Sequence, residues 1–354
     1  MAEVRWGILG CAGIAQKFAV ALAEAKNARV AAVASRSIAK AEAWAAENTP
    51  GAKAFGSYEE LLADPDVQAV YVPLPTGMRA DWVVRAAESG KHVLSEKPLG
   101  CTWSDTCRLV EACRKAGVQF MDNTMFMHNE RLEEMKSVLK DEKTFGKVTQ
   151  VVSAFTIPCA QEEEWAKGNI RMKRDTEPLG CLGDLGWYCV RFTLWAFDYD
   201  TPESVRCDYL EATDEKVPVR VAGTMRFSGS RTATFDCSFK HCMRQWAEVV
   251  GEKASLHVDD FVVPKETSTV SYSVRTGSIA DKALTFPGET TTKSLEIGTQ
   301  QHTQLVERFS KLVEEGTRDD FWPKVALQTQ QLMAALDLSA QKCGEWVRPD
   351  SLTS

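Results

Sequence analysis

No run of apolar residues in this chain of 354 residues is long enough to cross a membrane. A transmembrane helix needs roughly 18 consecutive apolar residues. A secretory signal peptide needs a shorter apolar stretch near the amino terminus, where this chain has Glu3 and Arg5 instead. We therefore expect a cytoplasmic protein without a membrane partner.

Basic residues are too few and too scattered for a nucleic-acid-binding protein. The chain has 42 lysines and arginines against 49 aspartates and glutamates, and its formal net charge is −7. Proteins that bind nucleic acid usually carry a dense basic patch that follows the phosphate backbone. We expect no nucleic-acid partner and a small molecule as the ligand.

Paired cysteines are missing as well. The eleven cysteines are an odd number, and no two of them form a CxxC motif of the kind that binds zinc or exchanges disulfides. Cys107 and Cys113 fall in a helical pattern and Cys237 in a strand pattern. We expect the cysteines to act as buried hydrophobic side chains, and we expect no metal site.

The order of the apolar runs predicts two domains. Between Val4 and Asp122, short apolar runs alternate with segments of helical spacing, which is typical of βαβ units around a parallel sheet. Beyond about Phe145, strand-like runs follow one another, and residues 219–227 alternate apolar with polar as in an antiparallel hairpin. We predict an α/β protein with an N-terminal Rossmann fold over residues 1–125. A C-terminal α+β domain with a large, mainly antiparallel open sheet is predicted over residues 126–354.

The first apolar run leads into GCAGIA, which has the spacing of a dinucleotide-binding fingerprint. Gly10, Ala12 and Ala15 occupy its three small-residue positions. The first allows a tight turn, the second lets the backbone approach a pyrophosphate, and the third packs the following helix on the strand. The N–H groups at the start of that helix, at Gly13 and Ile14, would bind the phosphates. Ala12 departs from the usual glycine, and a plain strand-turn-helix is the alternative interpretation.

The end of the second apolar run predicts which dinucleotide binds. An NAD enzyme usually places a carboxylate here for the ribose 2′-hydroxyl, but this chain has Ser35, Arg36 and Ser37. An arginine can pair with a 2′-phosphate and stack on adenine, and serine hydroxyls can donate to phosphate oxygens. We expect NADP(H) in preference to NAD(H). Either serine can also cap the following helix, and the two roles are compatible.

The apolar run KHVLS ends in Glu96, Lys97 and Pro98, at the carboxyl edge of the predicted sheet. Ligands of open α/β sheets bind outside this edge. A lysine ammonium held there can lower the pKa of a substrate hydroxyl and stabilise the alkoxide that forms. Pro98 restricts Lys97 to an extended backbone, so the tripeptide is suited to aiming the Lys97 side chain.

With this tripeptide the sequence resembles the glucose–fructose oxidoreductase and inositol dehydrogenase family, called Gfo/Idh/MocA. Members share the fingerprint, the Glu-Lys-Pro tripeptide, and a later helix with Asp and His or Tyr four residues apart, here Asp184 and Tyr188. The resemblance extends over nearly the whole chain, through YVPLPT at 71–76, NIR at 169–171 and Trp322-Pro323. These details look closest to a plant-type group of oxidoreductases related to dimeric dihydrodiol dehydrogenase and NADP-linked xylose dehydrogenase.

The resemblance implies roles for individual residues. Lys97 and Tyr188 would act at the reacting oxygen, Asp184 would bind substrate or orient the catalytic groups, and Arg171 and His128 would contact the substrate. A structural histidine is the alternative for His128, and a packed aromatic side chain is the alternative for Tyr188. His128 stands where many relatives have Arg, and Arg79 stands where relatives usually have His, so the substrate contacts are expected to differ. The cofactor-binding residues are expected to be Gly10, Ala12, Gly13, Ile14, Ala15, Ser35, Arg36, Ser37, Pro73, Leu74, Thr76, Glu96 and Lys97.

Together these residues predict reversible hydride transfer between a nicotinamide and an alcohol carbon of a sugar, polyol or trans-dihydrodiol. The cofactor would carry the hydride, and Tyr188, with a pKa lowered by Lys97, would carry the proton. A non-catalytic dinucleotide sensor and an enzyme that recycles a tightly bound NADP(H) are the alternatives. By analogy with the family we expect a homodimer.

Overall fold

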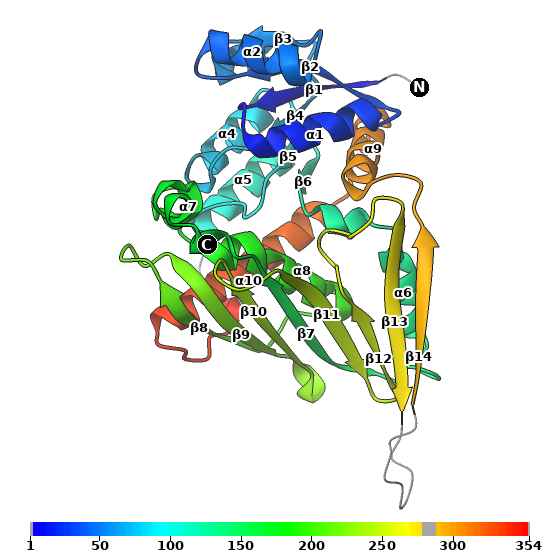
Figure 1. Ribbon diagram of the computed structural model, residues 1–354. Helices are drawn as coiled ribbons and strands as arrows, with labels where there is room; N and C mark the ends of the chain where they lie inside the picture. Colours follow the sequence, from blue (N-terminus) through cyan, green and yellow to red (C-terminus); the bar gives the residue numbers. More distant parts are fainter. Residues whose placement is uncertain (1–2, 278–287, 353–354) are drawn as a thin grey trace, which may run out of the picture. The chain divides into compact units, whose positions relative to one another are not determined.

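The computed structural model describes residues 3–277 and 288–352, and its contacts divide the chain into two compact units (Figure 1). The first unit runs to His128 and includes Thr299–Gln330. Of the described residues, the second unit comprises those within 129–298 and 331–352. The division falls inside α10 (Phe321–Gln341), and each unit has a sheet of its own.

The first unit is built on a parallel sheet with the strand order β3-β2-β1-β4-β5-β6. Because β1 pairs with β2 on one side and β4 on the other, the strand order reverses at β1. This is the doubly wound Rossmann order, in which a dinucleotide binds across the carboxyl ends of the strands at the point of reversal. The strands are β1 (Val4–Leu9), β2 (Ala28–Ala34), β3 (Lys53–Phe55), β4 (Ala69–Val72), β5 (His92–Ser95) and β6 (Phe120–Asp122).

Helices of the first unit follow its strands closely, as the alternation in the sequence predicts. Three of them begin after a hydroxyl side chain that accepts a hydrogen bond from the backbone N–H three residues later: Ser37, Ser57 and Thr102. Such caps satisfy donors that the first turn leaves open. The helices are α1 (Gly13–Glu24), α2 (Ile38–Asn48), α3 (Tyr58–Ala63), α4 (Thr76–Glu88), α5 (Trp103–Ala116) and α9 (Gln301–Glu314).

Helix α9 belongs to the first unit although it lies late in the chain. The indole Nε1 of Trp6 donates to Ser310 Oγ at 3.0 Å, and the ring of Trp6 packs on Phe309 with centroids 5.0 Å apart. In Figure 1, α1 and α9 lie side by side. The sequence predicted domains at 1–125 and 126–354, whereas these contacts group residues 299–330 with the first unit because α9 buries its apolar face there.

The second unit has an eight-stranded sheet with the order β14-β13-β12-β11-β7-β10-β9-β8, and only β7 and β10 pair in parallel. The expected hairpin is confirmed, because β9 pairs with β10 and buries Val219, Val221 and Met225 on one face. The strands are β7 (Val148–Thr156), β8 (Ser204–Ala212), β9 (Pro218–Arg226), β10 (Thr232–Ser238), β11 (Arg244–Gly251), β12 (Ala254–Val258), β13 (Thr269–Gly277) and β14 (Gly288–Glu296).

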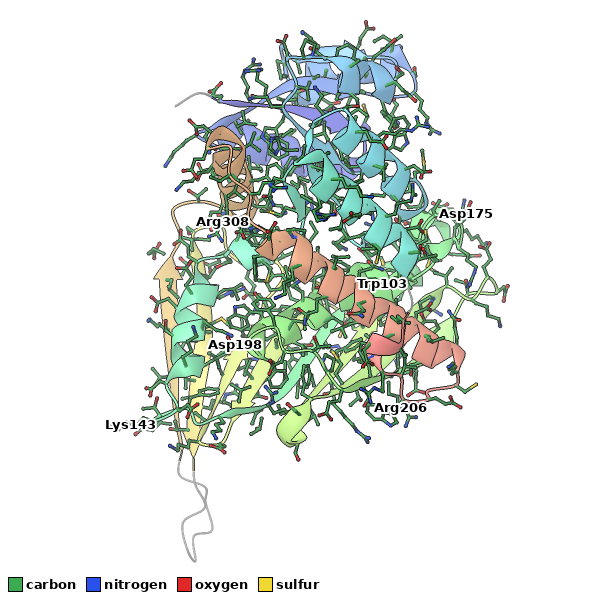
Figure 2. All side chains as sticks on the ribbon, turned by 180° about the vertical axis from the view of Figure 1, so that it is seen from behind. Trp103, Lys143, Asp175, Asp198, Arg206 and Arg308 are labelled. Carbon is green, nitrogen blue, oxygen red and sulfur yellow. The ribbon has the colours of Figure 1, made fainter. Side chains whose placement is uncertain are left out.

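Helices of the second unit are α6 (Arg131–Lys140), α7 (Glu163–Gly168), α8 (Trp187–Ala196) and the later part of α10. Strand β8 is tied to α10 by Tyr209, whose hydroxyl donates to Asp337 Oδ1 at 2.5 Å, and by the N–H of Cys207, which donates to Ser339 Oγ at 3.0 Å. Figure 2 shows α10 crossing this region, with Arg206 of β8 labelled near its end.

The fold class predicted from the sequence is confirmed, with one parallel and one mainly antiparallel sheet. Cys113 and Cys237 are buried in α5 and β10, and burial raises the pKa of the Cys113 thiol to about 12, so it remains a neutral thiol. The expectation of burial does not hold for every cysteine, because Cys107 is half-buried and Cys242 and Cys343 are exposed. Among the described residues, no group of histidine, cysteine, aspartate and glutamate side chains fits a metal ion. Within the same ranges, no helix is long and apolar enough to cross a membrane.

Candidate functional site

The predicted cofactor residues of the first unit follow the carboxyl ends of four neighbouring parallel strands. Residues 10–15 follow β1, residues 35–37 follow β2, residues 73–76 follow β4, and residues 96–97 follow β5. Parallel strands end at one edge of a sheet, so the structure brings all of these residues to the same edge. That edge is where open α/β sheets bind their ligands.

The turn between β1 and α1 fits a pyrophosphate. Gly10 has a φ of 117°, which suits glycine, and a Cβ there would lie 3.1 Å from Leu74 Cδ2. Ala12 precedes the helix and has no side-chain oxygen with which to cap its first N–H groups. A Cβ built on Gly13 meets no described atom within 4 Å, so the start of α1 is open. Exposed N–H groups at a helix start form a phosphate-binding site.

Two cationic side chains lie at the end of β2, where the sequence lacks a carboxylate. The charge of Arg36 acts on the phenol of Tyr58, and the charge of Lys40 acts on the thiol of Cys11. Ser37 Oγ accepts a hydrogen bond from the N–H of Lys40 at 3.4 Å and therefore caps α2, the structural role that the sequence left open. These cations and the start of α2 together fit a 2′-phosphate.

Glu96 is buried beyond the end of β5 and receives hydrogen bonds from the two flanking strands. Its Oε1 accepts from Tyr71 Oη at 2.5 Å and from Asn123 Nδ2 at 2.6 Å, and its Oε2 accepts from the backbone N–H of Lys97 at 3.3 Å. Sequence reasoning missed Tyr71 and Asn123. Asn123 directly follows β6, so the strand-end rule indicates it, but Tyr71 lies inside an apolar run that contains no such signal.

The loop that carries Lys97 is held on both sides by side chains of the first unit. Arg79 is buried, and its guanidinium donates to Leu74 O at 2.6 Å, to Thr76 Oγ1 at 2.9 Å and to Pro98 O. Gln330 Oε1 accepts from the N–H of Leu99 at 3.0 Å. The sequence suggested Arg79 as a change in substrate contacts, whereas these bonds make it a support for the loop.

In the second unit, Arg171 and Asp184 form an ion pair, with Arg171 Nε 2.7 Å from Asp184 Oδ2. Arg171 lies in a short 3₁₀ turn (Ile170–Met172) that is capped by Asn169, whose Oδ1 accepts from the N–H of Arg171 at 3.0 Å. The NIR motif therefore serves to present the arginine. Cys159 lies close to both charges, and its pKa is raised to about 11, first by burial and then by the charge of Asp184.

The segment between Asp184 and Tyr188 is not a continuous α-helix. Asp184 lies in a π-helical turn (Leu182–Gly186), and Tyr188 lies in the first turn of α8. An i→i+5 turn is wider than an α-helical turn, and residues four apart still lie near the same face. That Asp184 and Tyr188 act together stays a prediction. π-Helical turns occur frequently at functional sites. The ring of Tyr188 is buried and meets Phe155 edge-on, with centroids 5.6 Å apart.

His128 is buried in the first unit and stacks on Trp322, with ring centroids 4.6 Å apart and an interplanar angle of 15°. Arg308, labelled in Figure 2, lies over the other ring of this stack, Trp322, at 5.9 Å from its centroid. These contacts favour the structural alternative for His128. Its role in substrate binding stays a prediction.

Family models match most of both units. The model described as an oxidoreductase family with an NAD-binding Rossmann fold matches residues 4–124, and the model of the GFO/IDH/MocA C-terminal domain matches residues 133–257. The resemblance noted in the sequence is therefore confirmed, and it covers the residues at the edge of the first sheet and the Arg171–Asp184 pair alike.

Individual relatives are similar over nearly the whole chain. A dTDP-3,4-didehydro-2,6-dideoxy-alpha-D-glucose 3-reductase of Saccharopolyspora spinosa is 31% identical, covering 96% of this chain and 98% of the relative. A D-xylose 1-dehydrogenase (NADP(+)) of Haloferax volcanii is 31% identical, covering 88% and 89%. The crystal structure of a 3-ketoreductase from Actinomadura kijaniata in complex with NADP and TDP-benzene matches with a TM-score of 0.82 and 27% identity, covering 95% and 98%.

Proposed function

The chain belongs to the Gfo/Idh/MocA family of oxidoreductases, and on that premise we propose that it is an NADP(H)-dependent enzyme. Its reaction transfers a hydride to or from the CH–OH carbon of a sugar, a polyol or a trans-dihydrodiol. The observation that carries the proposal is the fixed loop of residues 96–100, which holds Lys97 at the ligand-binding edge of the first sheet.

The preference for NADP(H) rests on the end of β2. Arg36 pairs with the 2′-phosphate, Ser35 and Ser37 donate to its oxygens, and the open start of α1 binds the pyrophosphate. Relatives named for NADP, the xylose dehydrogenase and the ketoreductase complex, support this choice. Pro73, Leu74 and Thr76 line the cofactor where β4 ends.

The bound cofactor supplies or accepts the hydride. Lys97 stabilises negative charge on the substrate oxygen, and Tyr188 exchanges the proton with that oxygen. Asp184, held by Arg171, orients the substrate hydroxyls. His128 and Arg171 contact the substrate, and His128 is the next candidate for the proton donor if Tyr188 proves dispensable.

A substrate panel tests this function. Purified protein is mixed with NADP⁺ or NADPH and with aldoses, polyols, trans-dihydrodiols and the matching carbonyl compounds, and the absorbance of the reduced nicotinamide is followed. We expect turnover of at least one compound, with NADP⁺ preferred over NAD⁺. Lys97→Met is the control, because it should bind NADP⁺ yet lose most of the turnover, and activity that stays unchanged would indicate a contaminating dehydrogenase.

Two results would change the proposal. Cofactor binding without turnover of any compound would favour the dinucleotide sensor. NADP released on denaturing protein that was purified without added nucleotide would favour the enzyme that recycles a tightly bound cofactor. Failure to bind either dinucleotide would overturn the proposal altogether.

We also propose that the protein is a cytoplasmic homodimer, by analogy with the family. Light scattering at micromolar concentration measures its mass, and a mass of one chain would contradict the dimer.

A further inference from the structure

Glu96 is a buried carboxylate whose identified hydrogen-bond partners are all uncharged. The Nδ2 group of Asn123 and the backbone N–H of Lys97 can only donate hydrogen bonds. The third donor is the hydroxyl of Tyr71 in β4. Three donors around one carboxyl group fit its ionised form. Burial raises the pKa of Tyr71 well above its usual value, and the charge of Glu96 raises it further, so Tyr71 remains a protonated donor.

The two side-chain donors are themselves fixed by the sheet. Tyr71 lies in β4 opposite Leu94 of β5, and its ring stacks on Phe18 of α1 with centroids 4.0 Å apart. The N–H of Asn123 donates to Ser95 O at 2.8 Å, which anchors the residue beside the end of β5. The carboxylate therefore has one orientation, set from both neighbouring strands.

Three titratable groups lie near Glu96, and the test below therefore measures the change when its charge alone is removed. Burial lowers the pKa of His302 in α9, and the charge of Glu96 only partly opposes the decrease, so His302 is neutral near pH 7. Arg79 donates to Thr76 Oγ1 and to the carbonyls of Leu74 and Pro98, which are all uncharged, so it keeps its positive charge, and that charge acts on Tyr71. Lys97 adjoins Glu96 in the chain, and under the proposed function its ammonium serves the substrate oxygen.

A fixed charge at this edge acts differently on the two forms of a nicotinamide cofactor. The ring of NADP⁺ carries a positive charge, and the ring of NADPH carries none. In a doubly wound sheet the two halves of a dinucleotide bind on either side of the point of reversal. If the adenosine half lies at the end of β2, the nicotinamide half lies at the ends of β4 and β5. A buried anion there attracts the oxidised ring and has little effect on the reduced ring.

We propose that Tyr71 and Asn123 are positioning residues that hold the Glu96 carboxylate as a fixed negative charge, and that this charge strengthens the binding of NADP⁺ relative to NADPH. The inference rests on the proposed function, because it requires the nicotinamide cofactor. It assigns Glu96 a task separate from catalysis: the setting of the midpoint potential of the bound cofactor.

The test compares dissociation constants for the two cofactor forms. NADPH binding is measured by its fluorescence and NADP⁺ binding by calorimetry, for the wild type and for Glu96→Gln, Tyr71→Phe and Asn123→Ala. The ratio of Kd for NADPH to Kd for NADP⁺ should fall about 10- to 50-fold in Glu96→Gln and about 3- to 10-fold in the other two. Glu96→Asp keeps the charge but shortens the side chain, so it should retain more of the ratio than Glu96→Gln.

Tyr209→Phe is the matched control. Tyr209 is half-buried and also donates to a carboxylate, Asp337, at 2.5 Å, but both residues belong to the second unit. This variant should lose a similar amount of thermal stability and keep the wild-type ratio. Because a ratio of two constants cancels general damage to the site, a change confined to the Glu96 group is not explained by weaker folding. If Tyr71→Phe does not fold, Asn123→Ala and Glu96→Gln still decide the question.

The outcomes separate the inference from the function on which it rests. If the wild type binds both cofactor forms and turns over a substrate, but the ratio stays within about twofold in Glu96→Gln, the inference alone is overturned. If the wild type binds neither form, the proposed function fails and the inference fails with it. An equal weakening of both forms in all three variants also overturns the inference, because it means that the group only maintains the shape of the site.

Discussion

Glu96 in the first unit and Asp184 in the second are both carboxylates among the candidate site residues, but their hydrogen-bond partners and their exposure differ. Glu96 is 8% exposed and is held by neutral donors. The Asp184 side chain is 20% exposed and is paired with the guanidinium of Arg171. A carboxylate among neutral donors keeps its net charge, whereas one paired with arginine loses most of its field. Under the two proposals, Glu96 of the first unit acts on the cofactor by its charge, and Asp184 of the second acts on the substrate through hydrogen bonds.

The largest expected effects come from removing one reactive group in each unit. Tyr188→Phe should keep NADP⁺ binding but lose about 10²–10⁴-fold in kcat, because the proton donor is gone. Lys97→Met should lose a comparable factor, because negative charge on the oxygen is no longer stabilised. Steady-state kinetics on the best substrate of the panel, with cofactor binding measured by fluorescence, checks both.

The double variant sharpens the comparison between the units. If Lys97 and Tyr188 act on one oxygen, the combined loss should fall short of the product of the two single losses. Tyr272→Phe, in β13, is a control for the loss of a buried tyrosine hydroxyl. A near wild-type kcat in Tyr188→Phe would mean that another group exchanges the proton, and His128 is the next candidate. Wild-type activity in Lys97→Met would show that the assignment of the whole site is wrong.

Cofactor selectivity should depend on the first unit alone. Arg36→Ala should weaken NADP⁺ by about 1.5–3 kcal/mol and NAD⁺ far less, because only NADP⁺ has the 2′-phosphate. Calorimetric titration of both cofactors checks this. Arg29→Ala is the control, since Arg29 lies near the opposite end of the same strand and pairs with Glu3. Equal affinity of the wild type for the two cofactors would contradict the role of Arg36.

A smaller effect is expected from the carboxylate of the second unit. Asp184→Asn should lower kcat/KM by about 10- to 100-fold, shared between kcat and KM, because it removes a charged partner of both Arg171 and the substrate. NADP⁺ binding should not change. The kinetic constants and the cofactor titration are measured on the same preparation. If Asp184→Asn weakens NADP⁺ binding and leaves the KM for the substrate unchanged, Asp184 acts on the cofactor and not on the substrate.

The smallest effect is expected at Ser37, which has a structural role already visible. Ser37→Ala removes the cap of α2 and should lower the free energy of unfolding by about 1 kcal/mol. Thermal or denaturant unfolding measures this. If Ser37 also donates to the 2′-phosphate, the affinity for NADP⁺ should fall a few-fold while that for NAD⁺ stays the same. If the free energy of unfolding and the affinity for NADP⁺ both match the wild type, Ser37 has neither role.

Much of the fold could be predicted from the sequence, because it depends on patterns among residues close together in the chain. The alternation of apolar runs and helical spacing predicted the parallel sheet, and the two-residue alternation around Val219 predicted the hairpin of the second sheet. The cofactor residues were predicted by the same logic, since they come in the loops and helix starts that follow four of the strands. Their shared position at one sheet edge then follows from parallel pairing.

The remaining features depend on contacts that no local pattern contains. Arg79 supports the Lys97 loop through bonds to residues before and after it in the chain, and Tyr71 reaches Glu96 from within an apolar strand. The π-helical turn at Asp184 is a local departure from the α-helix that the residue spacing alone indicates. The placement of α9 depends on its packing against Trp6, some 300 residues away in sequence, as the Trp6–Ser310 bond illustrates.

The return of α9 to the first unit has a consequence during synthesis on the ribosome. Domains usually fold as units in the order in which they are made. Here the nucleotide-binding unit lacks α9 until residues 299–330 have left the ribosome. Until then, Trp6 cannot contact Phe309 or Ser310. Asn27 likewise lacks the acceptor of its hydrogen bond, the carbonyl of Glu307, which lies at 3.0 Å in the folded protein. The nascent chain therefore carries an unfinished first unit while the whole of the second sheet is being translated, and the last helices complete both units almost together.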